Sequence, residues 1–382
     1  MAKIKIYDER YLHLEKIDWD FKNTELDSLS SIHPYPARFI NEIPRTLIEE
    51  LGCPDNSGVL DPFCGSGTTL VEAQRKGLFS IGIDLNPIAC LISTVKVSPM
   101  PKDFITIVDM VYTTSIEAFQ GEIKIPQIPN LDHWFKKDIQ KALSCILDRI
   151  ERVTDETAKN ALKLALSSLI VRVSNQESDT RYAAIDKKHT AKDVFDNFKN
   201  ASKKLYEAKK ASQIIANTRV IESDILNVKV NDIGRKIGLI ITSPPYPNAY
   251  EYWLYHKYRM WWLGFDPIKV RTYEIGARPH YMKKNGQTEV DFYNQMDKVF
   301  DLSCNCLIAE GHICFVIGRS IIKGREINNA ELITDIAKKH GLVLVADIER
   351  EIASTRKSFN LSYGKIKTEN VLVYRKGQIL CE

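Results

Sequence analysis

The chain has neither a long apolar run nor a strong excess of one charge, and both absences limit its class. No apolar run in its 382 residues approaches the roughly 18 residues that a membrane span needs. Hydrophobic residues make up 44% and charged residues 27%, which is ordinary for a soluble globular chain. A net charge of +4 and a pI near 8.4 permit a polyanionic partner but fall short of the basic footprint of a dedicated nucleic-acid module.

A secretory signal and a metal-binding cysteine pattern are also missing. The start, Met1-Ala-Lys-Ile-Lys-Ile6, is charged and no apolar stretch follows it, so we expect a cytoplasmic protein with no membrane partner. The eight cysteines are scattered, and the closest pair, Cys304 and Cys306, lacks the Cys-x-x-Cys spacing of redox and zinc pairs. We therefore expect reduced, mostly buried thiols and no metal site.

Short apolar stretches rich in β-branched residues recur along the chain, and helical patterns separate most of them. The stretches are 58–61, 79–84, 219–222, 239–242, 312–317, 342–348 and 370–374. This alternation predicts an α/β fold with seven strands in a wound sheet.

Between about residues 101 and 216 the strand signal vanishes, and apolar residues recur every three or four positions instead. Three amphipathic helices are indicated, from Phe135 to Val153, from Leu162 to Val173 and from Val194 to Ile215. The chain is therefore divided into three parts. Residues 1–100 and 217–382 supply the two halves of the sheet domain, and residues 101–216 form a helical insertion.

Two features of the insertion suit a nucleic acid. The third helix carries lysines spaced by seven, four and seven, which places them on one face that can follow a phosphate backbone. They are Lys192, Lys199, Lys203 and Lys210. The polar run 174–182 before this helix is dense in groups that can read base edges. An ordinary solvated helix face and an ordinary surface loop are the alternatives.

The sequence predicts a cofactor-binding loop in the segment Leu60-Asp-Pro-Phe-Cys-Gly-Ser-Gly-Thr-Thr69. Gly65 and Gly67 lie between a strand and a helix that begins near Thr68, so the backbone can approach a ligand and the helix amides can face an anion. Leu70 stands where a dinucleotide fingerprint continues with a third glycine, and the P-loop pattern is absent. A P-loop ATPase is disfavoured, and the dinucleotide pattern is incomplete.

Two acids at strand ends indicate a nucleoside cofactor. Asp84 follows Gly67 by 17 residues, close to the roughly 20-residue offset at which an acid reaches ribose hydroxyls. Asp224 follows the strand at 219–222 and would end on the same edge of the sheet, where it can accept a hydrogen bond from an adenine amino group. A helix N-cap is the alternative role for each acid.

The segment Thr242-Ser-Pro-Pro-Tyr246 is more specific than the glycine pattern. Pro244 and Pro245 fix the backbone after a strand and leave nearby carbonyls without ladder partners. The Ser243 hydroxyl and the Pro244 carbonyl can accept hydrogen bonds from an exocyclic amine and direct its lone pair at an electrophile, while Tyr246 stacks on the base. A Pro-Pro loop that only caps a strand is the alternative.

Together these residues resemble the amino-methyltransferases that use S-adenosylmethionine to modify exocyclic amines in DNA. In that family Asp-Pro-Phe-x-Gly-x-Gly binds the methionine part of the cofactor and Ser/Asp/Asn-Pro-Pro-Tyr holds the target; here they lie at 61–67 and 243–246. A third match, Ser-Ile-His-Pro-Tyr-Pro-Ala-Arg-Phe at 31–39, is similar to the His-Pro-x-(Lys/Arg)-Phe stretch beside the cofactor's methionine end. The resemblance covers most of the chain outside the insertion.

The resemblance implies a seven-stranded, mostly parallel Rossmann-like methyltransferase sheet with one antiparallel strand near its edge. The half in residues 1–100 would bind the cofactor, and the half in residues 217–382 would be catalytic. Asp61 would meet the cofactor's amino group beside Phe63, Thr68 and Thr69 its carboxylate, Asp84 its ribose and Asp224 its adenine. The implied cofactor-lining set is His33, Tyr35, Phe39, Asp61, Phe63, Cys64, Gly65, Ser66, Gly67, Thr68, Thr69, Asp84, Leu85, Asp224 and Ile225.

The serine of Ser-Pro-Pro-Tyr resembles the cytosine-N4 branch, so we expect methylation of a flipped cytosine in double-stranded DNA, within restriction-modification or host defence and with a possible companion restriction endonuclease. Adenine N6, an RNA or protein amine, and a catalytically silent nucleic-acid-binding protein are the alternatives.

Target recognition is assigned to the insertion, helped by the loops 271–287 and 355–367. The candidate DNA contacts are Arg181, Lys199, Lys203, Lys210, Arg278, Lys283, Arg356 and Lys357. Solvated loops are the alternative.

Overall fold

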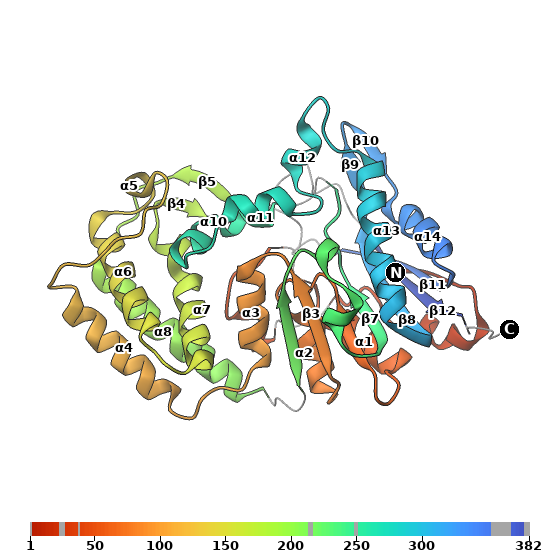
Figure 1. Cartoon of the computed structure of the whole chain (residues 1–382), viewed down its shortest axis with the longest axis horizontal. Coiled ribbons are helices and arrows are strands. Elements are labelled where there is room, and N and C mark those ends of the chain that lie inside the picture. Colours follow the sequence, from red (N-terminus) through yellow and green to blue (C-terminus); the bar gives the residue numbers. More distant parts are fainter. Residues whose placement is uncertain are drawn as a thin grey trace.

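The computed structural model describes residues 2–22, 27–36, 39–212, 217–247, 251–352 and 368–377, and in these ranges eight strands form one central sheet (Figure 1). In their order across the sheet the strands are β1 (Lys3–Ile6), β11 (Leu342–Glu351), β12 (Thr368–Lys376), β8 (Leu307–Gly318), β7 (Ile237–Thr242), β2 (Gly58–Asp61), β3 (Ser80–Asp84) and β6 (Thr218–Glu222).

Each of the seven predicted strands is present in this sheet, but the predicted number is wrong because β1 is an eighth strand at its edge. Strands β6, β3, β2, β7 and β8 are parallel to one another, so the sheet as a whole is mostly parallel. Two strands, β12 and β1, run opposite to the other six where one was expected, because β12 pairs antiparallel with β8 and β11, and β1 pairs antiparallel with β11.

Helices cover both faces of the sheet. Successive residues of a strand point to opposite sides, so one strand contributes to the apolar core on each face. On β7, Leu239 and Ile241 pack toward α1 (Glu42–Leu51), while Ile240 between them packs toward α13 (Glu289–Cys306) and α14 (Asn329–Lys339). The helices therefore cover the two faces and leave the carboxyl edge of the parallel strands free to build a site.

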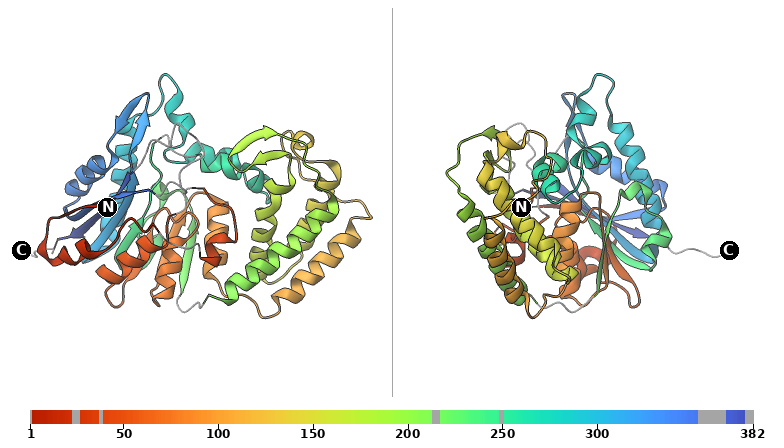
Figure 2. Two further views of the ribbon diagram at one scale, coloured as in Figure 1. Left: turned by 180° about the vertical axis from the view of Figure 1, so that it is seen from behind. Right: turned by 60° about the vertical axis from the view of Figure 1, so that its left-hand side comes forward.

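A helical half lies beside the sheet and shares an apolar cluster with α3 (Pro87–Val97) (Figure 2). The three predicted helices are present in it as α6 (Lys137–Glu151), α7 (Glu156–Val173) and α8 (Ala191–Lys210), and α4 (Phe104–Ala118) and the short α5 (Leu131–Trp134) accompany them. The prediction that strands vanish here is wrong: β4 (Gln176–Ser178) and β5 (Arg181–Ala184) form a hairpin in the polar run. Strands this short and polar carry no apolar alternation that a sequence pattern can detect.

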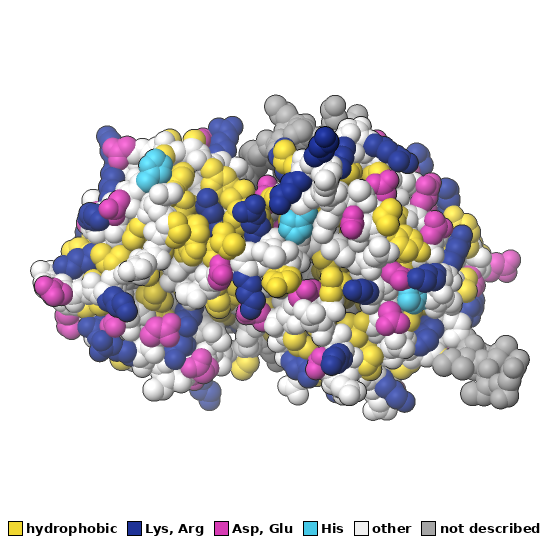
Figure 3. All heavy atoms as spheres, turned by 45° about the horizontal axis from the view of Figure 1, so that its top comes forward, with side chains coloured by type: hydrophobic (Ala, Val, Ile, Leu, Met, Phe, Trp, Pro, Cys, Tyr) yellow, Lys and Arg dark blue, Asp and Glu magenta, His cyan; other side chains and the backbone are white. Residues whose placement is uncertain are grey.

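Four elements lie above the carboxyl edge of the sheet, on the face shown in Figure 3: α10 (Tyr252–Trp262), α11 (Pro267–Tyr273), α12 (Arg278–Met282) and the hairpin of β9 (Ser320–Ile322) and β10 (Arg325–Ile327). The segment 271–287, expected to be a loop, thus contains a short helix. On this face Lys and Arg side chains lie on both sides of the junction between the two halves. In the described ranges no helix is both long and apolar enough to cross a membrane.

Candidate functional site

A cleft opens where β2, β3, β6 and β7 end, and the cofactor and target segments meet in it. The cleft and the solvent space at its open mouth together take up about 1100 Å³. Most of the predicted site residues line it: Tyr35, Phe39, Asp61, Phe63, Cys64, Gly65, Ser66, Thr68, Asp84, Leu85, Asp224, Ile225, Ser243, Pro244, Pro245 and Tyr246.

A hydrogen bond joins the two segments directly. The Thr242 hydroxyl, one residue before Ser243, donates to the Asp61 carboxylate over 2.7 Å, and both side chains are buried. The backbone amide of Phe63 donates to the same carboxylate oxygen over 3.1 Å. Burial raises the pKa of Asp61 to about 6, against the opposing effect of these hydrogen bonds. The position of the target segment is thereby fixed relative to the cofactor segment.

Asp84 shapes the glycine loop from the end of β3. Gly65 (φ 48°) and Gly67 (φ 76°) adopt left-handed conformations, and the Asp84 carboxylate accepts the Gly65 amide over 2.9 Å. Its other oxygen accepts the Asn86 amide over 2.8 Å. Asn86 is the N-cap of α3, so the N-cap alternative for Asp84 is excluded. Burial raises the pKa of Asp84 to about 6.

Asp224 is a helix N-cap that also lies at the cleft. Its carboxylate accepts the Leu226 amide over 3.0 Å as the N-cap of the short 3-10 helix Ile225–Asn227. It also lines the cleft at the end of β6. The carboxylate has acceptor positions beyond the one that the cap uses, so the cap leaves room for a ligand hydrogen bond.

Three residues of the predicted cofactor set do not line the cleft and instead support its wall. His33 is 3% exposed, and its Nε2 lies 2.9 Å from the Ser167 Oγ of α7. Thr69 is fully buried, with its hydroxyl 3.4 Å from the Ile241 carbonyl oxygen. Gly67 is the N-cap of α2 (Thr68–Arg75). A direct contact of these three residues with a cofactor stays a prediction.

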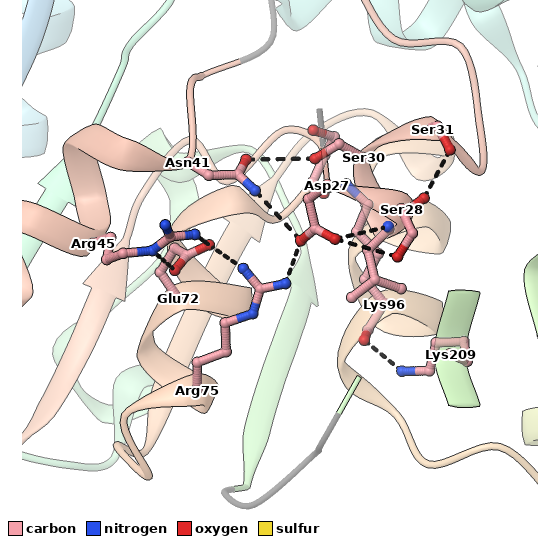
Figure 4. A network of polar contacts seen from close by, with 12 residues as sticks. Asp27, Ser28, Ser30, Ser31, Asn41, Arg45, Glu72, Arg75, Lys96 and Lys209 are labelled. Atoms are coloured by element: carbon pink, nitrogen blue, oxygen red, sulfur yellow. Dashed lines mark hydrogen bonds and ion pairs between the residues drawn. The ribbon is translucent and has the colours of Figure 1, made fainter. Parts of the chain in front are cut away.

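The segment that carries Tyr35 into the cleft is anchored on α1 and α2 through a polar network (Figure 4). Asp27 pairs with Arg75, which also donates to Glu72 over 2.6 Å. Glu72, whose side chain is 1% exposed, accepts a second ion pair from Arg45. The Glu72 carboxylate, buried and held by two guanidinium groups, thus keeps the segment that carries Tyr35 against the sheet domain.

Two buried lysines connect the cofactor loop to the helical half. The Lys96 ammonium donates to the Ser66 carbonyl over 2.8 Å. Lys209 of α8 in turn donates to the Lys96 carbonyl over 2.5 Å (Figure 4). Burial lowers the pKa of Lys209 to about 7. The glycine loop is thus supported from the helical half as well as from the sheet.

Three residues that line the cleft were not predicted from the sequence: Tyr252, Tyr273 and Glu274. The Glu274 carboxylate is 7% exposed and accepts the amides of Tyr252 and Trp253, each over 2.8 Å, at the start of α10. Burial raises the pKa of Glu274 to about 8. The rings of Tyr252 and Tyr35 stack with centroids 5.7 Å apart. The aromatic density of 250–263 was a signal for Tyr252, but no motif marks Glu274.

The candidate DNA contacts fall into separate places. Lys199 pairs with Asp109 over 2.8 Å and lies over the Tyr112 ring, so it is engaged inside the helical half. Lys203 and Lys210 are exposed on α8, which runs toward the side of the molecule opposite α12 (Figure 1). In contrast, Arg181 lies on β5 and Arg278 and Lys283 lie at α12, above the cleft edge. Arg356 and Lys357 lie outside the described residues.

Comparison with known proteins finds sequences that are similar to this chain. Residues 3–94 match the model of a protein family described as DNA methylase, of the N6/N4 methyltransferase type. The chain is 22% identical to the Type II methyltransferase M.MvaI of Kocuria varians, over 88% of this chain and 87% of that protein. It is 26% identical to the Type II methyltransferase M.BsoBI of Geobacillus stearothermophilus, over 71% of this chain and 61% of that protein.

A shorter stretch, 21% of this chain and 16% of the other protein, is 38% identical to the Type II methyltransferase M.MjaII of Methanocaldococcus jannaschii. The chain therefore spans less than two thirds of the length of two of these three relatives. The resemblance to the N4/N6 DNA amino-methyltransferases is confirmed. Methyltransferases of this family use S-adenosylmethionine as the methyl donor.

Proposed function

We propose that this chain methylates the exocyclic N4 amine of a cytosine that is flipped out of duplex DNA. The observation that carries the proposal is the joined pair of segments in one cleft, with Thr242 hydrogen-bonded to Asp61 over 2.7 Å. A donor held at Asp61 and an acceptor held at Ser243 would then face each other across the ends of neighbouring strands β2 and β7.

The residues of the cleft suit S-adenosylmethionine. A Cβ atom at Gly65 would lie 3.2 Å from the Tyr35 hydroxyl oxygen. The absence of a side chain therefore leaves space in which the cofactor can approach the Gly65 backbone closely. Asp61 suits the ammonium group of the methionine part, Asp84 the ribose and Asp224 the adenine amine. When bound, the cofactor supplies an electrophilic methyl group on a sulfonium. Acidic groups in a buried cleft favour this cationic ligand over a phosphate.

The target segment would activate the amine by position. The Ser243 hydroxyl and the Pro244 carbonyl would accept hydrogen bonds from the two N–H groups of the amine, which directs the nitrogen lone pair toward the methyl group. Pro245 fixes the backbone, and Tyr246 stacks on the extruded base, whose flipping costs a few kcal/mol. The amine loses a proton only after it has gained the methyl group, so a strong general base is not needed in this segment.

The serine of Ser-Pro-Pro-Tyr favours cytosine N4, and adenine N6 is the second candidate. Incubation with labelled S-adenosylmethionine and mixed duplex DNA tests the activity, with tRNA as a competing substrate. Sequencing that reports base modification in the DNA of a host expressing the chain then gives base and site together. Failure to transfer methyl groups to any duplex contradicts the proposal, and N6-methyladenine would overturn its choice of base.

The partners follow from the same proposal. Because the relatives are Type II methyltransferases, we assign the chain to restriction-modification, with duplex DNA as substrate and a companion endonuclease. Residues 101–216 are proposed to be the subdomain that helps to recognise the target. DNA methylated by this chain should resist the companion endonuclease, and cutting of fully methylated DNA would count against the pairing.

A substitution at Gly276 tests the position of the target segment. Gly276 has a left-handed backbone (φ 77°), and an added Cβ would lie 2.9 Å from the Tyr246 carbonyl oxygen. Gly276→Ala should therefore displace Tyr246 and lower the single-turnover rate at least about tenfold, with little change in cofactor affinity measured by calorimetry. Gly264→Ala, also left-handed but with open space at its Cβ, is the matched control. Equal rates in the two variants would refute the close approach.

A further inference from the structure

The hairpin of β4 and β5 is a two-stranded ribbon with a two-residue tip. Ser178 pairs with Arg181 across the tip, and Gln176 pairs with Ala184 at its base. The register shifts between Gln176 and Ser178, so the inner and outer faces of the ribbon are assigned from the burial and contacts of its side chains. The inner face carries Gln176 and Tyr182.

The inner face is fastened to α10. Tyr182 donates a hydrogen bond to the Leu254 carbonyl, and the Lys257 ammonium lies 4.6 Å from the centre of its ring. Arg259, whose side chain is 1% exposed, pairs with Asp179 at the tip and donates to the Ser167 carbonyl of α7 over 3.2 Å. Asp179 is 28% exposed, but its loss would leave the buried Arg259 guanidinium without its charge partner, which is costly, so the ribbon is held in one position.

The outer face is polar and open. Arg181 has 67% of its side chain exposed and pairs over 2.9 Å with Glu177, which is 34% exposed. Ala183, also on this face, is exposed and small, which leaves room for close approach. An exposed ion pair is weak and easily exchanged for other partners. Arginine can donate two hydrogen bonds to guanine, and glutamate can accept one from the amine of cytosine.

The ribbon lies next to the cleft mouth. Tyr252, the first residue of α10, lines the cleft, and Lys257 on the same helix touches the ribbon. The rise of 1.5 Å per helical residue separates these two positions by about 8 Å along the axis. The major groove of duplex DNA, about 12 Å wide, admits a two-stranded ribbon. Lys and Arg side chains on both sides of this junction suit the flanking phosphates (Figure 3).

We propose that the outer face of the β4–β5 ribbon reads base edges in the major groove of the target duplex, with Arg181 donating to a guanine. The inference rests on the proposed function and adds the element that selects the sequence. Through α10, the ribbon in the groove has a fixed distance to the cleft that receives the flipped base. Recognition and base capture are then set by one rigid unit.

The test compares variants on duplexes in which each base pair of the methylated sequence is changed in turn. Arg181→Ala should reduce the preference for the correct base pair at one position about ten- to a hundredfold. Ala183→Glu, which adds bulk and negative charge to the outer face, should weaken binding to every duplex at least about tenfold. Lys338→Ala, exposed on α14 of the sheet domain, is the control and should change neither. Cofactor binding by calorimetry and thermal melting should match the wild type in all three.

The outcomes separate the two levels of the proposal. If the wild type methylates no duplex, the proposed function itself fails. If the wild type methylates a defined sequence and Arg181→Ala keeps the full preference at every position, only the ribbon inference is overturned. A uniform loss of affinity across all sequences in Arg181→Ala would also overturn it, because that pattern belongs to a phosphate contact.

Discussion

Replacing Ser243 by alanine should lower the rate of methyl transfer about 100- to 1000-fold, the usual cost of losing one hydrogen-bonding group that positions charge in a transition state. The serine follows Thr242, whose hydrogen bond to Asp61 fixes the segment, so the substitution removes the hydroxyl without moving the backbone. Affinity for S-adenosylmethionine should stay the same. Single-turnover transfer of a labelled methyl group gives the rate, and calorimetry gives the affinity.

The matched control is Ser168→Ala in α7, where the hydroxyl donates only to the Ala165 carbonyl of its own helix. It should leave rate and affinity unchanged. A parallel fall in cofactor affinity in Ser243→Ala would show that the serine supports the cleft rather than the amine. An unchanged rate would remove the physical basis for positioning the amine through this hydroxyl.

The cofactor loop and the strand ends could be predicted because their structure is local. Gly65 and Gly67 need left-handed backbone that the sequence itself signals, and Asp84 at the end of β3 acts on the loop that leaves the neighbouring strand β2. The contact between Thr242 and Asp61 could not be derived, because no local pattern places β7 beside β2. Glu274 caps a helix that begins 22 residues earlier, so its role depends on how α10 and α11 fold back on each other.

The missed strands have a common physical cause. Strand β1 has four residues, two of them lysines, and β4 has three polar residues, so neither contains the apolar run that marks a short buried strand. Their stability comes from partners remote in sequence: β1 adds to the edge of β11, and Tyr182 fastens the hairpin to α10. For such segments tertiary contacts decide the structure, whereas the longer apolar strands carry their own signal.

S-adenosylmethionine should bind about 100-fold more weakly at pH 5 than at pH 7. Burial raises the pKa of Asp61 and of Asp84 to about 6, so both are mainly ionised at pH 7 and mainly protonated at pH 5. Each carboxyl that must ionise to accept the cofactor's hydrogen bonds costs about a factor of ten one pH unit below its pKa. Glu274, with a pKa of about 8, stays protonated through this window and does not contribute.

Unfolding cannot imitate this effect, because its sign is opposite. A carboxyl whose pKa is raised from 3.8 to about 6 on folding favours the folded chain when protonated, and that stability is lost as the pH rises through 6. With respect to these two groups the free chain is therefore more stable at pH 5, where binding is weaker. Calorimetric titrations at several pH values measure the dependence. Asp84→Asn should reduce it to about tenfold, and a dissociation constant that is the same at pH 5 and pH 7 would show that neither carboxylate binds the cofactor.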